Sequence, residues 1–322
     1  MDEERYPTEY PVPDVAPYRR GNTGIDYVHT FDAGRSGPHV MLNALTHGNE
    51  VCGAYALDQL FGWNVRPQRG KLTLSFANVA AFARFSLAQP ADSRWAEEDF
   101  NRVWSTGELD GPRTSVELRR ARELRPVVAS ADLLLDLHSM HLRAPPVMIA
   151  GPHPKGRELA RRLGVPSFVI SDLGHASGSR MRDYGGFGDP SSLKNALLVE
   201  CGHHGERSAA DVALGTALAF LRASGIIDPA LFAAHPAPAP GPQRFIEVTH
   251  PITIKTANFA FDAPYTGMET IADAGTVIAH DGDEPVATPY DRCVLVMPAP
   301  RRYLKPGLTA VRLGRVIGAA DA

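Results

Sequence analysis

Three apolar runs that each end in polar residues constrain the fold of this chain most strongly. They lie at residues 40–45, 131–138 and 195–202. Each has the length and the Leu, Val and Ala content of a buried strand. A helical pattern follows the first run at about 50–63, and a further strand pattern lies at 71–77. Strand, helix and strand at this spacing are typical of a βαβ unit, so the sequence predicts an α/β fold with a mixed, largely parallel sheet.

The turn after the first run brings two metal-binding residue types together. His47 and Glu50 lie on either side of Gly48, between the predicted strand and the predicted helix. Because they are three residues apart across the first helical turn, both side chains can point at one spot. An imidazole and a carboxylate are common zinc ligands. The same residues also suit an ordinary turn with a carboxylate at a helix N-terminus, so this stretch alone leaves both interpretations open.

Two other strand ends carry groups of the same kind. His138 ends the second run, and Glu200 lies near the end of the third. Ligands of open α/β sheets bind at the carboxyl ends of the strands, so we expect these residues to converge with His47 and Glu50. Taken singly, His138 also suits a hydrogen-bonded core histidine, and Glu200 an ion-paired or helix-capping carboxylate. Asp136 is expected to point to the face opposite His138, in a structural or supporting role.

The overall composition narrows the class of protein. The chain has 322 residues, 44% of them hydrophobic and 21% charged, and a formal net charge of -3. These values are ordinary for a globular protein and favour neither a nucleic-acid partner nor a membrane surface. No apolar run approaches the length that spans a bilayer, and the acidic N-terminus lacks the profile of a signal peptide. The three cysteines lie far apart in the sequence, so we expect no disulfide framework and a cytoplasmic protein.

Two long segments without clear periodicity are expected to form functional loops. They lie at 80–113, where residues 91–104 are dense in charged types, and at 171–194. Long loops in compact domains are usually functional or disordered. Trp95 and Trp104 favour a packed loop in the first segment.

The composition changes sharply near residue 235. The stretch HPAPAPGP at 235–242 can neither continue a helix nor pair as a strand, and short alternating runs separated by Gly, Asp and Pro follow it. We therefore predict an α/β domain at 1–234, a Pro-rich linker at 235–244 and a small all-β domain at 245–322.

Four motifs together resemble the succinylglutamate desuccinylase/aspartoacylase family, a branch of the zinc carboxypeptidase-like superfamily. They are His-Gly-Asn-Glu at 47–50, Arg-Trp with Asp-Phe-Asn-Arg at 94–102, Asp-Leu-His at 136–138 and Val-Glu-Cys-Gly at 199–202. The motifs follow the order of the family at suitable intervals, and the C-terminal β domain is typical of it as well. The resemblance implies a zinc carboxypeptidase-like fold, with helices on both faces of the sheet.

The resemblance also implies a metal site and a catalytic base. His47, Glu50 and His138 would bind one Zn²⁺ per chain and leave one position open for water. Glu200 would take the proton as water attacks, and then pass it to the leaving amine.

Three residues of the first loop have implied roles toward the substrate. Arg94 would stabilise the oxyanion that forms during attack. Asn101 and Arg102 would hold the α-carboxylate of the amino-acid half, since a guanidinium group matches a carboxylate in a two-bonded fork.

One departure from the family pattern affects the substrate. Some members place another arginine shortly before the catalytic glutamate, at the position that Pro190 occupies here. Arg180, Arg182 and Tyr184 lie further upstream in the second loop and are candidates for substrate contact. Tyr303 in the C-terminal domain is a further candidate.

We therefore predict a zinc-dependent hydrolase that removes an acetyl or succinyl group from an N-acyl amino acid. The alternatives are a metallocarboxypeptidase-type peptidase, a deacylase for a basic or neutral N-acetylated amino acid, and a non-catalytic metal- or ligand-binding member of the fold. The expected partner is a small N-acyl amino acid, with no nucleic acid and no membrane. The sequence does not specify the acyl group or the amino acid, and it leaves open whether a homo-oligomer forms.

Overall fold

The computed structural model describes residues 6–174 and 177–318. The strands of its larger part are β1 (Val28–Asp32), β2 (His39–Ala44), β3 (Lys71–Phe76), β4 (Leu133–Met140), β5 (Val147–Ile149), β6 (Phe168–Ser171) and β7 (Asn195–His203). β3, β2, β4 and β7 are parallel neighbours, and β5 and β6 are parallel to each other. β1 pairs antiparallel with β3, and β5 with β7. The predicted mixed, largely parallel sheet is therefore confirmed.

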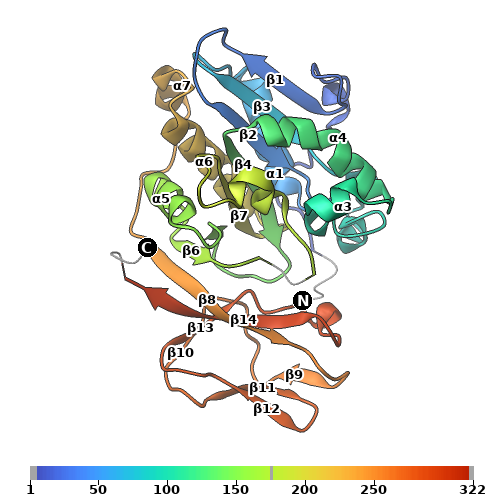
Figure 1. Ribbon diagram of the computed structural model, residues 1–322, viewed down its shortest axis with the longest axis vertical. Coiled ribbons are helices and arrows are strands. Elements are labelled where there is room, and N and C mark those ends of the chain that lie inside the picture. The colour runs from blue at the N-terminus through green and yellow to red at the C-terminus, as the bar shows by residue number, and fades with distance from the viewer. Residues whose placement is uncertain (1–5, 175–176, 319–322) are drawn as a thin grey trace.

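Helices cover both faces of this sheet (Figure 1). One face carries α1 (Val51–Gly62), α5 (Pro154–Leu163) and α6 (Arg207–Ser224), and the other carries α4 (Val116–Ser130). Leu134 packs with α4 while the next residue, Leu135, packs with α1 and α6, because successive strand residues point to opposite faces. Such a strand is buried on both sides, which explains its nearly continuous apolar sequence.

Shorter elements complete the larger part of the chain. They are α2 (Val79–Phe82), α3 (Thr106–Asp110), α7 (Pro229–Ala234), η1 (Ala16–Tyr18), η2 (Pro90–Ser93), η3 (Phe100–Arg102), η4 (Met181–Asp183) and η5 (Gly185–Phe187). Across the described ranges, none of the helices has both the length and the apolar character needed to cross a membrane.

The C-terminal strands continue the large sheet. They are β8 (Arg244–Thr253), β9 (Phe259–Phe261), β10 (Thr270–Ile271), β11 (Val277–Asp281), β12 (Glu284–Ala287), β13 (Cys293–Val296) and β14 (Thr309–Ile317), with η6 (Arg301–Tyr303) between the last two. β8 pairs in parallel with β6, so the 11-stranded sheet runs β1-β3-β2-β4-β7-β5-β6-β8-β14-β13-β10. β12, β11 and β9 form a separate antiparallel sheet at the end of the molecule (Figure 1). The predicted small β region is present, and its first strand is hydrogen-bonded to the α/β part.

The Pro-rich segment packs against the helices of the α/β part. The ring of His235 stacks on Trp63 at 3.6 Å, and the backbone nitrogen of Gly241 donates to the carbonyl oxygen of Gly164 at 3.0 Å. The division into 1–234, 235–244 and 245–322 remains a proposal. These contacts and the β6–β8 pairing attach the C-terminal strands to the α/β part of the chain.

Candidate metal centre

The turn between β2 and α1 positions the first two candidate ligands. Leu45 has a φ of 59°, in the left-handed region, and Glu50 is the N-cap of α1. A Cβ on Gly48 would lie 2.4 Å from the carbonyl oxygen of Ser93 and 2.5 Å from the backbone nitrogen of Phe82. Gly48 is therefore required by the close approach of neighbouring backbone, while the left-handed turn residue is Leu45.

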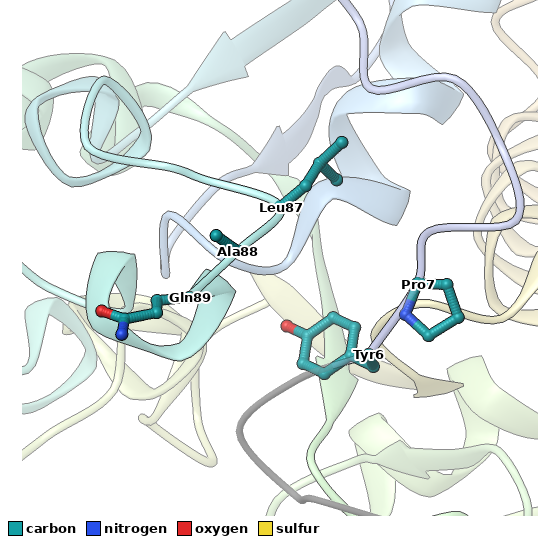
Figure 2. A pocket seen from close by; sticks show the side chains of 5 residues that line it. All are labelled: Tyr6, Pro7, Leu87, Ala88 and Gln89. Carbon is teal, nitrogen blue, oxygen red and sulfur yellow. The ribbon is translucent and has the colours of Figure 1, made fainter.

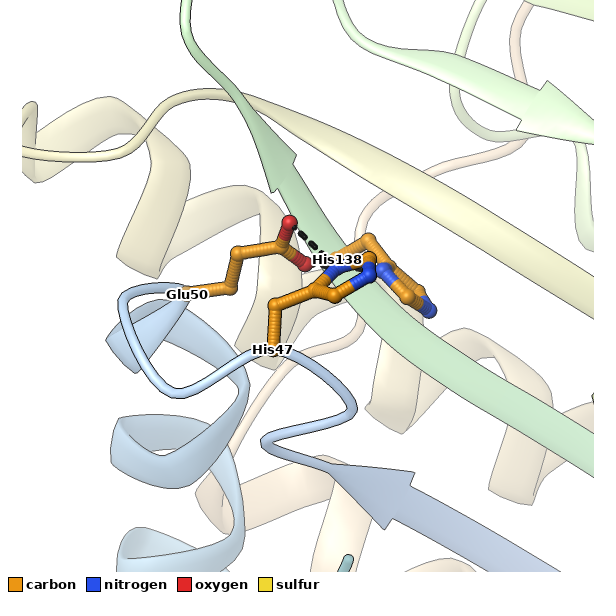
Figure 3. A group of neighbouring side chains, drawn as sticks. All are labelled: His47, Glu50 and His138. Carbon is orange, nitrogen blue, oxygen red and sulfur yellow. Dashed lines mark hydrogen bonds and ion pairs between the residues drawn. The ribbon is translucent and has the colours of Figure 1, made fainter. Parts of the chain in front are cut away.

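His47, Glu50 and His138 converge on one point (Figure 3). Nδ1 of His47 lies 2.7 Å from Oε1 of Glu50, and Nδ1 of His138 lies 2.7 Å from Oε2 of Glu50. One ligand atom from each residue lies within 4.8 Å of the others, and all three side chains are buried. Two imidazoles and one carboxylate form the donor set of many catalytic zinc sites, so the residues fit a metal ion.

The second ring nitrogen of His47 and that of His138 each contact a further carboxylate. Nε2 of His47 lies 2.9 Å from Asp99, and Nε2 of His138 lies 2.8 Å from Asp136. Metal-binding histidines commonly donate their second N–H to a carboxylate, which orients the ring. The expectation that Asp136 points away from His138 is wrong, because residues two apart on a strand share a face. Asn43 donates to Asp136 at 2.8 Å and so fixes this carboxylate in turn.

The charges in this cluster stabilise one another. Burial alone would raise the pKa of Glu50, but the two adjacent imidazoles outweigh it and hold this pKa well below its usual range. Burial alone would lower the pKa of His138, but the carboxylates of Asp136 and Glu50 raise it well above its usual range. The carboxylates around the two imidazoles therefore favour a positive charge at this point. Protonation of an imidazole supplies that charge, and a bound metal cation would supply it in the same way.

Glu200 lies beside the cluster on β7, directly opposite His138 in the β4–β7 ladder. Its Oε2 atom is buried and accepts no hydrogen bond from any described residue. Burial raises the pKa of Glu200 to about 7; the charge of Glu50 acts in the same direction, while His138, His47 and Arg94 oppose it. A carboxylate with a pKa near neutrality and a free lone pair is suited to proton transfer.

The first long loop brings two predicted arginines to the cluster. Nη1 of Arg94 donates to Glu50 at 3.0 Å, and its Nη2 lies 3.6 Å from Asp99. Arg102 approaches the same oxygen of Asp99 at 3.9 Å. Asp99 therefore links the ring of His47 to both guanidinium groups, a role that the sequence did not assign to it.

The two long loops are joined to each other. Val103 and Ser179 form a parallel β-bridge, and the side-chain oxygen of Asn101 accepts a hydrogen bond from the backbone nitrogen of Met181 at 2.8 Å. A Cβ on Gly178 would lie 2.2 Å from a backbone oxygen of the first loop, so this junction needs glycine. A change in one loop will therefore displace the other.

Arg180 and Arg182 are held by buried groups of the protein. Arg180 forms a two-bonded pair with Asp172, at 2.7 and 3.0 Å, and donates to Asp183 at 2.6 Å. Arg182 donates to Asp183 and to two backbone carbonyl oxygens. Their predicted contact with the substrate remains a prediction, but these partners favour a structural role.

We expect Arg180→Met to lower the free energy of unfolding by about 3–5 kcal/mol, because Asp172 would stay buried without its charged partner. The midpoint of denaturant unfolding measures this change. The matched control is Arg19→Met, which removes an exposed pair with Asp26 and should cost at most about 1 kcal/mol. Unchanged stability together with a raised KM would instead assign Arg180 to substrate binding.

The structure places the two predicted tyrosines in different surroundings. Tyr184 accepts a hydrogen bond from Arg125 at 2.9 Å and packs edge-on against Trp104. Tyr303 lies in η6 and lines a cavity together with Arg94. Of the two, Tyr303 is therefore the one beside a group of the candidate site.

Four rings that the sequence did not assign to the site, those of Tyr6, His203, His204 and His141, form a row that ends at Tyr303. The ring centroid of Tyr6 lies 5.1 Å from His203 and 5.5 Å from His204; His141 lies 4.6 Å from His204 and 5.4 Å from Tyr303. Within the described ranges, the hydroxyl of Tyr6, Nε2 of His204 and both nitrogens of His141 are buried without a hydrogen-bond partner. The position of His204 just after a strand end was the only sequence signal, and Tyr6 carries none.

The N-terminal segment forms one wall of a cavity beside this row. Figure 2 shows Tyr6 and Pro7 on one side and residues 87–89 on the other. The cavity has a volume of about 400 Å³ and is lined by Tyr6, Pro7, Leu87, Ala88 and Gln89. The backbone of Glu9 donates to Gly205 at 2.8 Å, and the hydroxyl of Tyr10 donates to the backbone oxygen of His204 at 2.8 Å. These bonds fix the segment against the turn that follows β7, the strand that carries Glu200.

The matched part of the chain contains the whole candidate centre. Residues 36–221 match the family model described as the succinylglutamate desuccinylase/aspartoacylase catalytic domain. This range includes the three candidate ligands, Arg94 and Glu200.

Solved structures share the fold over most of their length. Succinylglutamate desuccinylase from Vibrio cholerae has a TM-score of 0.65 at 18% identity, covering 91% of this chain and 86% of that chain. The desuccinylase from Chromobacterium violaceum has a TM-score of 0.63 at 18% identity, covering 91% and 89%. The product-bound ectoine utilization protein EutE (DoeB) from Ruegeria pomeroyi has a TM-score of 0.59 at 18% identity, covering 89% and 88%. No curated protein sequence matches the chain significantly.

Proposed function

The chain belongs to the succinylglutamate desuccinylase/aspartoacylase family, and from this premise we propose that it is a zinc-dependent hydrolase that removes the acyl group from an N-acyl amino acid. Members of the family are deacylases of small substrates. The observation that carries the proposal is the convergence of His47, Glu50 and His138 beside Glu200.

The three ligand candidates account for the metal chemistry. His47, Glu50 and His138 would hold the ion, and two imidazoles with one carboxylate suit zinc. When bound, zinc would supply Lewis acidity, which polarises a carbonyl group and makes water more acidic. Asp99 and Asp136 keep the two rings in orientation through their hydrogen bonds to the second nitrogens.

The other residues move the proton and hold the substrate. Oε2 of Glu200 would accept a proton from the attacking water and deliver it to the leaving amine. Arg94 would stabilise the negative charge that develops on the carbonyl oxygen. Arg102 would bind the α-carboxylate of the amino-acid half. Because the side-chain oxygen of Asn101 already accepts from Met181, its amide nitrogen is the atom that can donate to that carboxylate.

A substrate panel tests the proposal. N-acetyl and N-succinyl derivatives of acidic, basic and neutral amino acids, with a set of dipeptides, are assayed for released amine. The proposal predicts release from N-acyl amino acids and none from dipeptides. Release of C-terminal residues from dipeptides would instead support a peptidase. Bound metal without turnover of any compound would support a ligand-binding role.

The activity should depend on pH through Glu200. Only the ionised carboxylate can accept a proton, and burial raises its pKa to about 7. In the metal-bound protein the cation stabilises the carboxylate and lowers this pKa, so we expect kcat/KM to be full at neutral pH and to fall about tenfold per pH unit below the lowered pKa. The residual activity of Glu200→Gln should not show this fall of kcat/KM at acid pH. If the fall persists in that variant, another group causes it.

A cytoplasmic location is part of the same proposal. Cys52, Cys201 and Cys293 are all free and buried, which suits a reducing compartment.

A further inference from the structure

Glu117 is a buried carboxylate that has no part in the proposed mechanism so far. It lies in the first turn of α4 and is 0% exposed. Its Oε1 atom accepts hydrogen bonds from Nδ2 of Asn78 at 3.0 Å and from the backbone nitrogen of Ala96 at 2.7 Å. Its Oε2 atom accepts from the backbone nitrogens of Glu97 and Glu98, at 3.1 and 3.3 Å. Burial of a carboxylate is unfavourable unless it is hydrogen-bonded, so these four bonds stabilise it in this position.

The three backbone donors form a concave anion site in the first long loop. Residues 96, 97 and 98 are consecutive, and their N–H groups all point at the one carboxylate of Glu117. Successive backbone N–H groups in a turn commonly bind anions in this way. The loop segment 96–98 is therefore folded around the charge of Glu117.

This segment connects the two loop residues that contact the candidate ligands. Arg94 precedes it and donates to Glu50 at 3.0 Å. Asp99 follows it and lies 2.9 Å from Nε2 of His47. Only residues 95–98 separate the two, so a displacement of this short stretch moves one or both of them.

Further bonds connect the same carboxylate to the turn between β2 and α1. The side chain of Asn78 binds Glu117, and its backbone nitrogen donates to the carbonyl oxygen of Leu45 at 2.8 Å. The backbone nitrogen of Gly48 donates to the carbonyl oxygen of Arg94 at 3.1 Å. Glu117 therefore lies where the first loop, the end of β3 and the ligand-bearing turn are bonded together.

The loop also binds α4 in the reverse direction. Oε2 of Glu97 accepts a hydrogen bond from the backbone nitrogen of Val116, the first residue of α4, at 2.7 Å. A carboxylate is stabilised at a helix N-terminus by the N–H groups there. Each segment thus supplies a carboxylate to the backbone of the other, and the loop is fixed to the helix at two points.

We propose that Glu117 is a positioning residue for the reaction. By holding residues 96–98, it sets the place of Arg94 beside the substrate carbonyl and that of Asp99 beside the ring of His47. This role rests on the proposed deacylase function. Arg94 is assigned to the oxyanion, which forms only in the transition state, so the effect of Glu117 belongs to kcat more than to KM.

Glu117→Gln tests the positioning role. The amide keeps the size of the side chain, but its nitrogen cannot accept the hydrogen bonds of the oxygen that it replaces. We expect kcat for the best N-acyl amino acid of the panel to fall about 10- to 100-fold, the usual effect of losing a group that orients site residues, with KM little changed. Rates of amine release at saturating Zn²⁺ measure both constants without a contribution from metal affinity.

The matched control is Glu123→Gln. Glu123 lies on the same helix with its side chain 58% exposed, so its replacement removes the same charge away from the loop. Both kinetic constants should stay at the wild-type level.

A double-mutant cycle with Arg94→Met separates positioning from a general loosening of the fold. If Glu117 acts through Arg94, Glu117→Gln should lower kcat by a much smaller factor in the Arg94→Met background than in the wild type. A side chain that only stabilises the fold would lower kcat by the same factor in both. Thermal unfolding checks that each variant is folded at the assay temperature. Should Glu117→Gln not fold, Glu117→Asp, which keeps the charge but withdraws it by one methylene group, takes its place in the cycle.

Two outcomes would overturn the positioning role. They are an unchanged kcat in the folded Glu117 variant, and equal factors in the two backgrounds. In both cases amine release by the wild type shows that the deacylase function still holds. Failure of the wild type to release amine from any compound would refute the deacylase function itself, and with it the role of Glu117 in that reaction.

Discussion

Glu200→Gln is expected to lower kcat by about 10²- to 10⁴-fold, the usual contribution of a general base. The amide has nearly the shape of the carboxylate but cannot take a proton from water. Glu200 is not one of the three candidate ligands, so metal content should stay at the wild-type level. Initial rates of amine release and elemental analysis of the same sample measure both effects.

The matched control for this variant is Glu247→Gln. Glu247 is exposed on β8, so its replacement removes the same charge away from the cluster and should leave the rate unchanged. Wild-type turnover by Glu200→Gln would contradict the general-base assignment. Loss of metal from that variant would show instead that Glu200 helps to hold the ion.

His138→Ala is expected to remove most of the bound metal and with it the hydrolytic activity. The variant deletes one of three protein ligands and leaves Glu50 and Asp136 buried without the imidazole that both contact. Breaking a buried charged pair typically costs about 3–5 kcal/mol, so the free energy of unfolding should fall as well. Elemental analysis and denaturant unfolding test the two effects separately.

His153→Ala is the control for this second change. His153 precedes α5 and donates one hydrogen bond from Nε2 to the backbone oxygen of Gly188, so its loss should leave the metal content intact. Wild-type metal content in His138→Ala would contradict the ligand assignment, whatever the stability of the variant.

The sequence was sufficient to predict the strands and the convergence of the candidate ligands. Parallel strands end at one edge of a sheet, so a histidine or glutamate at each of three strand ends was expected near that edge, and the family resemblance implied that they form one site. The structure brings His47, Glu50 and His138 together at the ends of β2 and β4, with Glu200 on β7. Local periodicity located the strands, and the four family motifs in their order along the chain indicated which residues at the strand ends form the site.

Contacts between residues far apart in the chain could not be predicted from the sequence. Tyr6 of the N-terminal segment packs against His203 just after Glu200, and Arg302 of the C-terminal region lines a cavity together with Arg94. Neither lies in a motif or a periodic stretch. The pairing of β6 with β8 was also unforeseen, because the hydrophobic pattern of a strand does not reveal its neighbour. The ion pairs of Arg180 could have been predicted from the sequence, because its partners Asp172 and Asp183 lie close to it in the chain.

The most direct test of the central claim is amine release by the wild-type protein before and after removal of its metal. The protein is stripped with a chelator, assayed on the best N-acyl amino acid of the panel, reloaded with Zn²⁺ and assayed again. We expect stripping to abolish release and about one zinc ion per chain to restore it. Equal rates of release by the stripped and the reloaded protein would contradict it.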